Sequence, residues 1–131
     1  MTKFLKLAAL TVCSVATLTG VAYAAADDYR FEPVAQEVRN GAGSDIAVRL
    51  IHVPTGKPVE NAIIFRTRLD MSPDKMEAMT TTVEPAEESE PGVYRFRADF
   101  TMAGRWALKL MAKVQGEAET VQGTVTFKVK E

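Results

Sequence analysis

The strongest constraint on the fold is a two-residue alternation of apolar and polar side chains, which recurs in short stretches along most of the chain. The stretches fall at residues 46–52, 62–70, 93–101, 105–113 and 125–130, with turn-forming residues between them. Because successive side chains of a β-strand point to opposite faces, each stretch predicts a strand with one buried face. No long stretch has a helical period. The sequence therefore predicts an all-β fold, an immunoglobulin-like antiparallel β-sandwich of about seven strands.

The phase of the alternation predicts which side chains form the core. The predicted inward sets are Ile46, Val48, Leu50 and His52; Ile63, Phe65, Thr67 and Leu69; Tyr94, Phe96, Ala98 and Phe100; Trp106, Leu108, Leu110 and Ala112; and Val125, Phe127 and Val129. We expect Trp106 to be buried and to face Tyr94 or Phe96 across neighbouring antiparallel strands. The glycine-containing segment from Asn40 to Ser44 is predicted to be a loop.

Residues 1–24 are predicted to form a secretory signal peptide. A positive start and an apolar stretch lead to small residues at Ala22 and Ala24, the pattern of a cleavage site. The one cysteine, Cys13, lies inside this segment, and the residue before it is larger than a lipoprotein signal requires. We therefore expect a periplasmic protein, residues 25–131, that forms one domain without a lipid anchor, a thiol or a disulfide.

Composition narrows the function classes further. Without Lys3 and Lys6, the predicted mature chain has fourteen Lys and Arg residues against seventeen Asp and Glu residues, a net charge near minus three. No basic stripe with interleaved aromatic residues is present, so nucleic-acid binding is not expected. Beyond the signal peptide, no apolar run is long enough to predict a membrane span.

The sequence contains few features that are typical of a catalytic site. His52 is the one histidine, and it has neither a cysteine partner nor a serine in a nucleophile-elbow motif. No glycine-rich phosphate loop and no paired-histidine zinc motif occurs. Asp70 and Asp74 could flank a pocket, but acidic residues beside a helix start usually serve as caps. We therefore expect a protein that is not an enzyme.

The segment from Asp70 to Thr80 interrupts the strand pattern and contains three of the six methionines. Ser72 followed by Pro73 is a typical helix start, so one short helical turn is predicted here. Such a turn would place Met76 and Met79 on one face, with Met71 folded over it. The cluster could be a flexible apolar plug for the end of the core. Composition alone favours this plug, and the alternative is a set of soft thioether ligands for Cu(I).

A soft metal site would draw on side chains from more than one element. The candidate ligands are Met71, Met76, Met79, Met102 and His52. Met102 lies in the turn before Trp106, and an indole could shield Cu(I) beside the thioethers. The alternatives are a strand-end histidine without a metal for His52 and simple core packing for Trp106.

An ordered set of short motifs resembles the YtkA-like, or FixH-type, domain family over roughly residues 45–115. The motifs are Thr55-Gly56-Lys57-Pro58-Val59, the methionines Met71, Met76 and Met79, Pro91-Gly92-Val93-Tyr94, and Met102-Ala103-Gly104-Arg105-Trp106. The resemblance implies a β-sandwich of an exported or membrane-tethered protein. It also implies an accessory role in copper handling, heavy-metal efflux or cytochrome oxidase maturation. Unlike the FixH type, this chain has no retained membrane helix in its predicted mature part.

Two functional hypotheses follow from the residues and the resemblance. The first is a periplasmic, non-enzymatic protein that binds Cu(I) through its methionine cluster and serves copper handling or heavy-metal efflux. The second is a metal-free interaction module that docks on an efflux or cytochrome oxidase assembly protein, with the methionines as an adaptable apolar contact.

The signal peptide gives the first testable prediction. We expect the exported protein to begin at Ala25 and to carry no lipid, because Ala22 and Ala24 form the cleavage pattern and Cys13 lacks a suitable lipoprotein context. N-terminal sequencing and intact mass measure both features. A mass that includes diacylglycerol on Cys13 would contradict the prediction.

Overall fold

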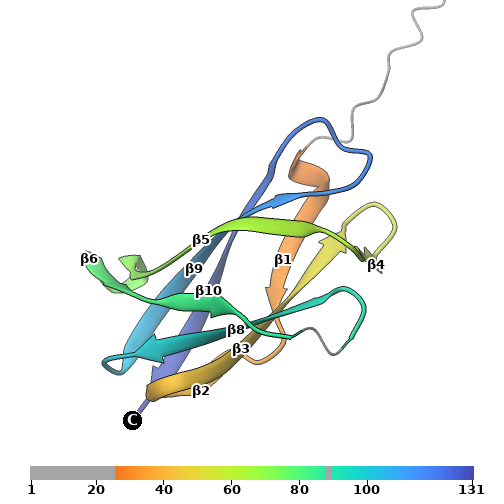
Figure 1. The fold of residues 1–131 in the computed structure, drawn as a ribbon. Helices are drawn as coiled ribbons and strands as arrows, with labels where there is room; N and C mark the ends of the chain where they lie inside the picture. The colour runs from red at the N-terminus through yellow and green to blue at the C-terminus, as the bar shows by residue number, and fades with distance from the viewer. Residues whose placement is uncertain (1–25, 88–89) are drawn as a thin grey trace, which may run out of the picture.

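The predicted strands form two β-sheets that pack face to face in a computed structural model, which describes residues 26–87 and 90–131 (Figure 1). The first sheet has the order β1-β3-β8-β7, with β4 beside β3, and the second has the order β2-β10-β9-β5-β6. All strand pairs are antiparallel except β2 with β10. The all-β, immunoglobulin-like sandwich is therefore confirmed. The predicted signal peptide lies outside the described residues.

The elements have the following bounds. They are η1 (Ala26–Asp28), β1 (Tyr29–Pro33), β2 (Glu37–Arg39), β3 (Gly41–His52), β4 (Lys57–Pro58), β5 (Ile63–Met71), η2 (Ser72–Asp74), β6 (Met76–Thr81), β7 (Val83–Pro85), β8 (Val93–Phe100), β9 (Gly104–Lys113) and β10 (Val121–Lys130). Both η elements are single 3₁₀ turns. Among the described residues, no helix is long and apolar enough to cross a membrane.

The core lies between the two sheets, and four strands bury the side chains that their alternation predicts. The predicted inward sets of β8, β9 and β10 are all buried, and so are Ile46, Val48 and Leu50 of β3. Trp106 and Phe127 are the largest fully buried side chains, and they lie opposite each other on β9 and β10. Phe31 of β1 also reaches this core, because Gly123 on β10 leaves room for its ring.

The N-terminal segment changes from one sheet to the other. β1 pairs with β3 and ends at Pro33, whose ring nitrogen cannot donate to a ladder. The chain then crosses to β10, where the Lys128 N–H donates to the Gln36 carbonyl and the Asn40 N–H donates to the Lys130 carbonyl. This crossing leaves a gap between β2 and the first half of β3, which is described with the site below.

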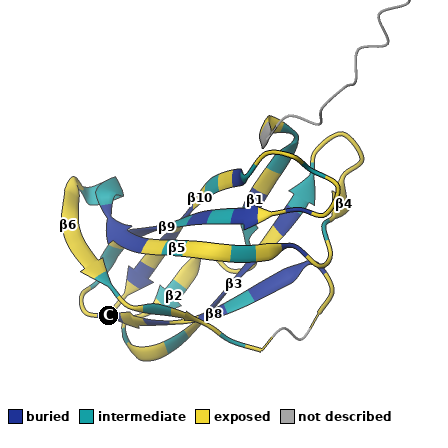
Figure 2. Ribbon diagram, turned by 45° about the horizontal axis from the view of Figure 1, so that its top comes forward, coloured by how far each residue is buried: buried dark blue, intermediate teal, exposed yellow. Residues whose placement is uncertain are grey.

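The predicted phase of β5 is wrong in its first half. A bulge between Ile64 and Arg66 adds one residue on the β5 side of the ladder with β9. One extra residue reverses which face each earlier side chain occupies. Ile63 is consequently 66% exposed and Phe65 51% exposed, while Ile64 packs against the core. Figure 2 shows the exposed stretch along β5.

A second irregularity replaces the predicted loop from Asn40 to Ser44. Gly41 to Ser44 belong to β3, with a bulge in the ladder to β8. Gly43 has a φ of 65°, in the left-handed region that glycine adopts readily. Its N–H donates to the Asp99 carboxylate at 2.8 Å. The glycines therefore shape a bulged strand end and not a free loop.

Trp106 is fully buried, as predicted, but its predicted neighbours are wrong. The turn after Phe100 carries the chain to the opposite sheet, so β8 and β9 are not adjacent strands. The Trp106 ring contacts Phe100 edge-on, with 5.7 Å between centroids and 63° between planes. Its indole N–H donates to the Met102 carbonyl at 3.1 Å. Alternation predicts which face is buried, but it does not predict which strands pair.

The packing of Trp106 gives a stability prediction. Trp106→Ala removes a fully buried ring and the bond to Met102, so we expect the free energy of unfolding to fall by about 3–5 kcal/mol. Urea denaturation of both proteins measures the difference. Val53→Ala, at a 49% exposed position, is the control and should change stability by less than about 0.5 kcal/mol. A melting temperature near that of the wild type would contradict the central role of Trp106.

Candidate functional site

A tight connection between β5 and β6 forms one end of the sandwich. Pro73 lies in the first turn of η2, where its fixed φ suits a helix start. Lys75 then adopts the left-handed conformation, with φ 60° and ψ 29°, and its N–H donates to the Ser72 carbonyl at 3.0 Å. This residue ends the turn after three residues. The short helical turn therefore occurs, but it does not extend to the methionines that follow.

Met76 and Met79 lie on β6 and not on a helix, so the predicted shared helical face is wrong. Met76 pairs with Met71 across the β5–β6 hairpin, and the ladder shifts register between Asp70 and Met71. The side chains of Met76 and Met79 are 37% and 38% exposed. Met71, by contrast, is completely buried, as its phase relative to Leu69 predicts.

A buried carboxylate holds this hairpin in place. Asp70 has no exposed surface, and its Oδ2 accepts hydrogen bonds from Arg68 Nε at 2.9 Å and from Lys109 Nζ at 3.1 Å. Its Oδ1 accepts the Ser72 N–H at 3.0 Å, although the N-cap position of η2 is Met71 and carries no side-chain cap. Arg68 also donates to the Glu77 carbonyl at 3.1 Å, which ties β6 to β5. The carboxylate thus joins β5, η2 and β9.

The pKa of Asp70 reflects two opposing causes. Burial alone would raise this pKa, because it disfavours the charged form. Hydrogen bonds from Ser72, Arg68 and Lys109 favour the charged form and together lower the pKa well below its usual range. Arg68 and Asp70 are two residues apart on one strand, so their side chains share a face. That spacing is a signal from which the pair could have been predicted.

A second carboxylate connects η2 to the start of β9. Asp74 accepts the Arg105 N–H at 2.8 Å and the Arg105 Nε–H at 2.7 Å. Arg105 also donates to the Pro73 carbonyl at 2.9 Å. The backbone and guanidinium hydrogen bonds lower the pKa of Asp74. These contacts fix the position of the hairpin against β9.

Gly104 allows these elements to approach closely. A Cβ atom at this position would lie 2.6 Å from the Met71 methyl and 2.8 Å from Asp74 Oδ2. Its φ of 142° also lies in a region that glycine tolerates best. The glycine of the Met102-Ala103-Gly104-Arg105-Trp106 motif therefore has a packing role beside Met71. Sequence analysis alone did not identify that role.

The structure brings Met71, Met76 and Met102 to the same end of the sandwich. Met71 lies opposite Met76 and contacts Gly104, which is two residues after Met102. Met102 is 36% exposed, and its carbonyl is held by Trp106. In Figure 1, β6 and the β8–β9 turn both lie on the left side of the molecule. We name Met71, Met76, Met79 and Met102 the methionine end.

His52 lies at the opposite end and cannot share an ion with the methionine end, which corrects its assignment as a ligand there. It is the last residue of β3, whereas Gly41, the first residue, pairs with Phe100 near the Met102 turn. A strand of this length spans roughly 35 Å. His52 Nδ1 lies 2.8 Å from Thr55 Oγ1, and its ring lies 5.2 Å from that of Tyr29.

Harder metal ligands are not grouped in the part of the chain that the structure describes. Within residues 26–87 and 90–131, no three His, Cys, Asp or Glu side chains come together as a metal site. Zn²⁺ and Ca²⁺ sites normally require such groups.

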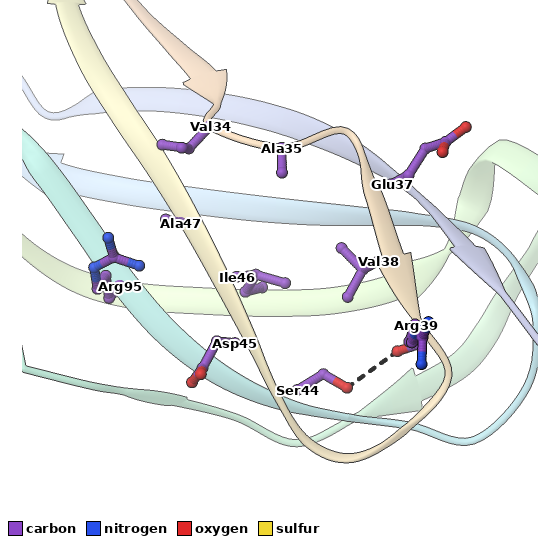
Figure 3. Close-up of a pocket in the computed structure, with 10 residues that line it drawn as sticks. All are labelled: Val34, Ala35, Glu37, Val38, Arg39, Ser44, Asp45, Ile46, Ala47 and Arg95. Carbon is purple, nitrogen blue, oxygen red and sulfur yellow. Dashed lines mark hydrogen bonds between the residues drawn. The ribbon is translucent and has the colours of Figure 1, made fainter.

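A separate cleft of about 400 Å³ opens between β2 and β3, where the chain crosses between sheets (Figure 3). Val38 and Ile46 lie along it, and Asp45 and Arg95 line one side. Ser44 Oγ donates to the Arg39 carbonyl across the narrow end at 3.1 Å. Its ten lining residues include neither histidine nor cysteine.

Fold and site together define the class: an immunoglobulin-like β-domain with thioether side chains gathered at one end. The family model described as YtkA-like matches residues 23–111, which is more than half of the chain. The chain therefore belongs to the YtkA-like family. A comparison with curated protein sequences gives no match.

Three solved structures are similar to this chain. The Lin-41 filamin domain is 14% identical, with a TM-score of 0.42, over 79% of this chain and 92% of that one. The ZirS C-terminal domain is 12% identical, with a TM-score of 0.43, over 80% and 67%. The Yersinia pseudotuberculosis adhesin InvE is 14% identical, with a TM-score of 0.43, over 79% of this chain and 26% of the adhesin.

The Asp70 network gives a pH-dependent prediction. Asp70→Asn removes a buried charge that is bound by two half-exposed cations and a backbone N–H. We therefore expect the free energy of unfolding to fall by about 2 kcal/mol at pH 7. Because the fold lowers the pKa of Asp70, its stabilisation is complete above the unfolded pKa of about 4 and is lost as pH falls below it.

Urea denaturation of wild type and Asp70→Asn from pH 7 to pH 2.5 tests this dependence. The stability difference should shrink steadily below about pH 4. The control is Asp45→Asn, because Asp45 forms an exposed pair with Arg97 at 3.7 Å, and such pairs contribute little. Equal stability of wild type and Asp70→Asn at pH 7 would contradict the role of the carboxylate.

Proposed function

We propose that this chain is a periplasmic, non-enzymatic accessory protein that binds Cu(I) at the methionine end. The observation that carries the proposal is the meeting of the β5–β6 hairpin with the β8–β9 turn. Met71 lies opposite Met76, and its methyl group packs on Gly104 beside Met102. Membership of the YtkA-like family is compatible with such an accessory domain.

The donor chemistry favours Cu(I) over harder ions. Thioether sulfur is a soft, neutral donor that carries no proton, and Cu(I) is the soft ion that thioethers select. Cu(II) and Zn(II) prefer imidazole, thiolate or carboxylate ligands, which are not grouped at this end among the described residues. The half-exposed side chains of Met76 and Met102 would meet the ion from the two turns, and the buried Met71 would form the floor. Met79 would add a donor from further along β6.

The surrounding residues would hold the turns in place while the thioethers adjust. Asp70 and Asp74 anchor the hairpin through Arg68, Lys109 and Arg105. Trp106 holds the Met102 carbonyl and packs on Phe100, so its role is to fix the second turn and to shield the floor. In this proposal copper is cargo, and the protein serves copper handling or heavy-metal efflux.

The second candidate is a metal-free interaction module. Met76, Met79 and Met102 are each more than one third exposed, and together they offer a flexible apolar surface. Such surfaces adapt to a partner because the methionine side chain is unbranched and mobile. The partner would be an efflux protein or a cytochrome oxidase assembly protein.

Anaerobic Cu(I) titration against a chromophoric chelator tests the first proposal. Met76→Leu combined with Met102→Leu keeps side-chain volume, so stability should change by less than about 1.5 kcal/mol per site. Cu(I) affinity should nevertheless fall steeply, because two of the four sulfur donors are lost. Met111→Leu, on the outer face of β9, is the matched control and should bind like the wild type.

The pH profile separates the two ligand types. Wild-type affinity for Cu(I) should stay level between about pH 8 and pH 5.5, because thioethers do not titrate, and His52→Ala should leave it unchanged. If the Met76→Leu, Met102→Leu protein binds Cu(I) as tightly as the wild type, the metal proposal fails and the docking module takes its place.

A further inference from the structure

The outer face of the second sheet carries a concentration of positive charge. Its outward side chains on β5, β9 and β10 include seven cations, which we name the cationic face. They are Arg66, Arg68, Arg105, Lys109, Lys113, Lys128 and Lys130. The strand register brings them into three adjacent rows, with Arg68 beside Lys109 and Arg105 beside Lys128. Half of the fourteen Lys and Arg residues after the predicted signal peptide therefore lie on one surface.

Carboxylates neutralise only part of this face. Asp70 is shared by Arg68 and Lys109, Asp74 pairs with Arg105, and Glu37 pairs with Lys130. Within residues 26–87 and 90–131, Arg66, Lys113 and Lys128 form no ion pair. The cationic face therefore keeps a clear positive excess, although the chain as a whole is slightly acidic.

Large apolar side chains project from the same surface. Ile63 lies beside Lys113, and Phe65 occupies the bulge next to Arg66. Their exposed fractions, 66% and 51%, are the two highest among the exposed large hydrophobic residues described. Figure 2 shows that the half of β5 in which they lie is mostly exposed, whereas the other end of the strand is buried. A hydrophobic strip therefore lies directly among cations.

A shallow hollow of about 400 Å³ lies at the centre of the cationic face. Arg66, Arg68 and Lys109 line it together with the polar side chains of Gln122 and Thr124. Guanidinium, ammonium, amide and hydroxyl groups are all donors to phosphate oxygens. The acidic residues of the other sheet include Glu84 on β7, while Glu87 follows β7 and Glu90 precedes β8.

We propose that the cationic face docks on the surface of an anionic phospholipid bilayer. Basic residues are attracted to the negative headgroups, and the apolar strip enters the interface between headgroups and acyl chains. A bilayer satisfies cations spread over three strands together with apolar side chains that project from a sheet. The acidic segment near β7 would face away from the bilayer and help to orient the molecule.

Vesicle co-sedimentation tests the proposal with the purified protein. Vesicles of equal parts phosphatidylcholine and phosphatidylglycerol should bind it, vesicles of phosphatidylcholine alone should bind it far more weakly, and added salt should release it. Arg66→Gln with Lys113→Gln should weaken binding by about fivefold per cation. Ile63→Ser with Phe65→Ser should weaken it by about tenfold, because the apolar strip no longer inserts.

The matched control is Arg49→Gln with Arg97→Gln, which removes the same charge from exposed positions on β3 and β8 in the other sheet. It should bind vesicles nearly as well as the wild type. Unchanged melting temperatures should show that every variant folds. Equal loss of binding in the control and in Arg66→Gln, Lys113→Gln would overturn the proposal, because net charge and not this face would then govern binding.

Tryptophan fluorescence tests insertion directly. Phe65→Trp should show a blue shift and quenching when the phosphatidylglycerol vesicles carry brominated acyl chains. Val34→Trp, at a 40% exposed position near the sheet crossing, should show neither change. Binding to polyglutamate or to inorganic phosphate without binding to the anionic vesicles would overturn the proposal in favour of an acidic protein or a free anion.

Discussion

The buried carboxylate of Asp70 is the interaction on which the methionine end depends. A charge without solvent contact is stable only when its partners replace the lost water, and here Arg68, Lys109 and the Ser72 N–H do so. These three partners come from β5, from its neighbour β9 and from η2, respectively. Asp70 therefore fixes the position of the hairpin relative to β9. The hydrogen bond from Arg68 to the Glu77 carbonyl fixes β6 as well. The chain can then expose flexible methionines without losing the shape of that end.

The close contact at Gly104 completes the same arrangement from the other turn. Because no Cβ is present, the Met71 methyl and the Asp74 carboxylate reach the backbone of β9 directly. Trp106, two residues later, holds the Met102 carbonyl from within the core. The sulfur-bearing segments are thus supported by a rigid shell of charge, hydrogen bonds and packing. At the proposed Cu(I) site this shell would position the donors, since thioether ligands themselves restrict geometry very little.

Side-chain alternation predicted the fold class and the buried faces of β3, β8, β9 and β10, because burial on one face imposes a period of two. It failed where a bulge shifts the period, as at Phe65, and it gave no information on strand pairing, as for Trp106. The methionine segment was recognised, but the left-handed Lys75 that ends the helical turn was not. The cationic face was missed for a related reason. Its residues are dispersed along the sequence and gather only when three strands align.

The bulge in β5 allows this strand to contribute both to the methionine end and to the cationic face. A strand with unbroken alternation would turn Ile63 and Phe65 into the core together with Leu69 and Met71. The extra residue lets one strand serve two surfaces. Its second half delivers Leu69 and Met71 inward, and its first half delivers Ile63 and Phe65 outward. A bulge interrupts a ladder, and strands that hold one are commonly shaped for a specific use. The outward apolar residues of β5 are therefore a consequence of the backbone itself and not of loose packing at an edge.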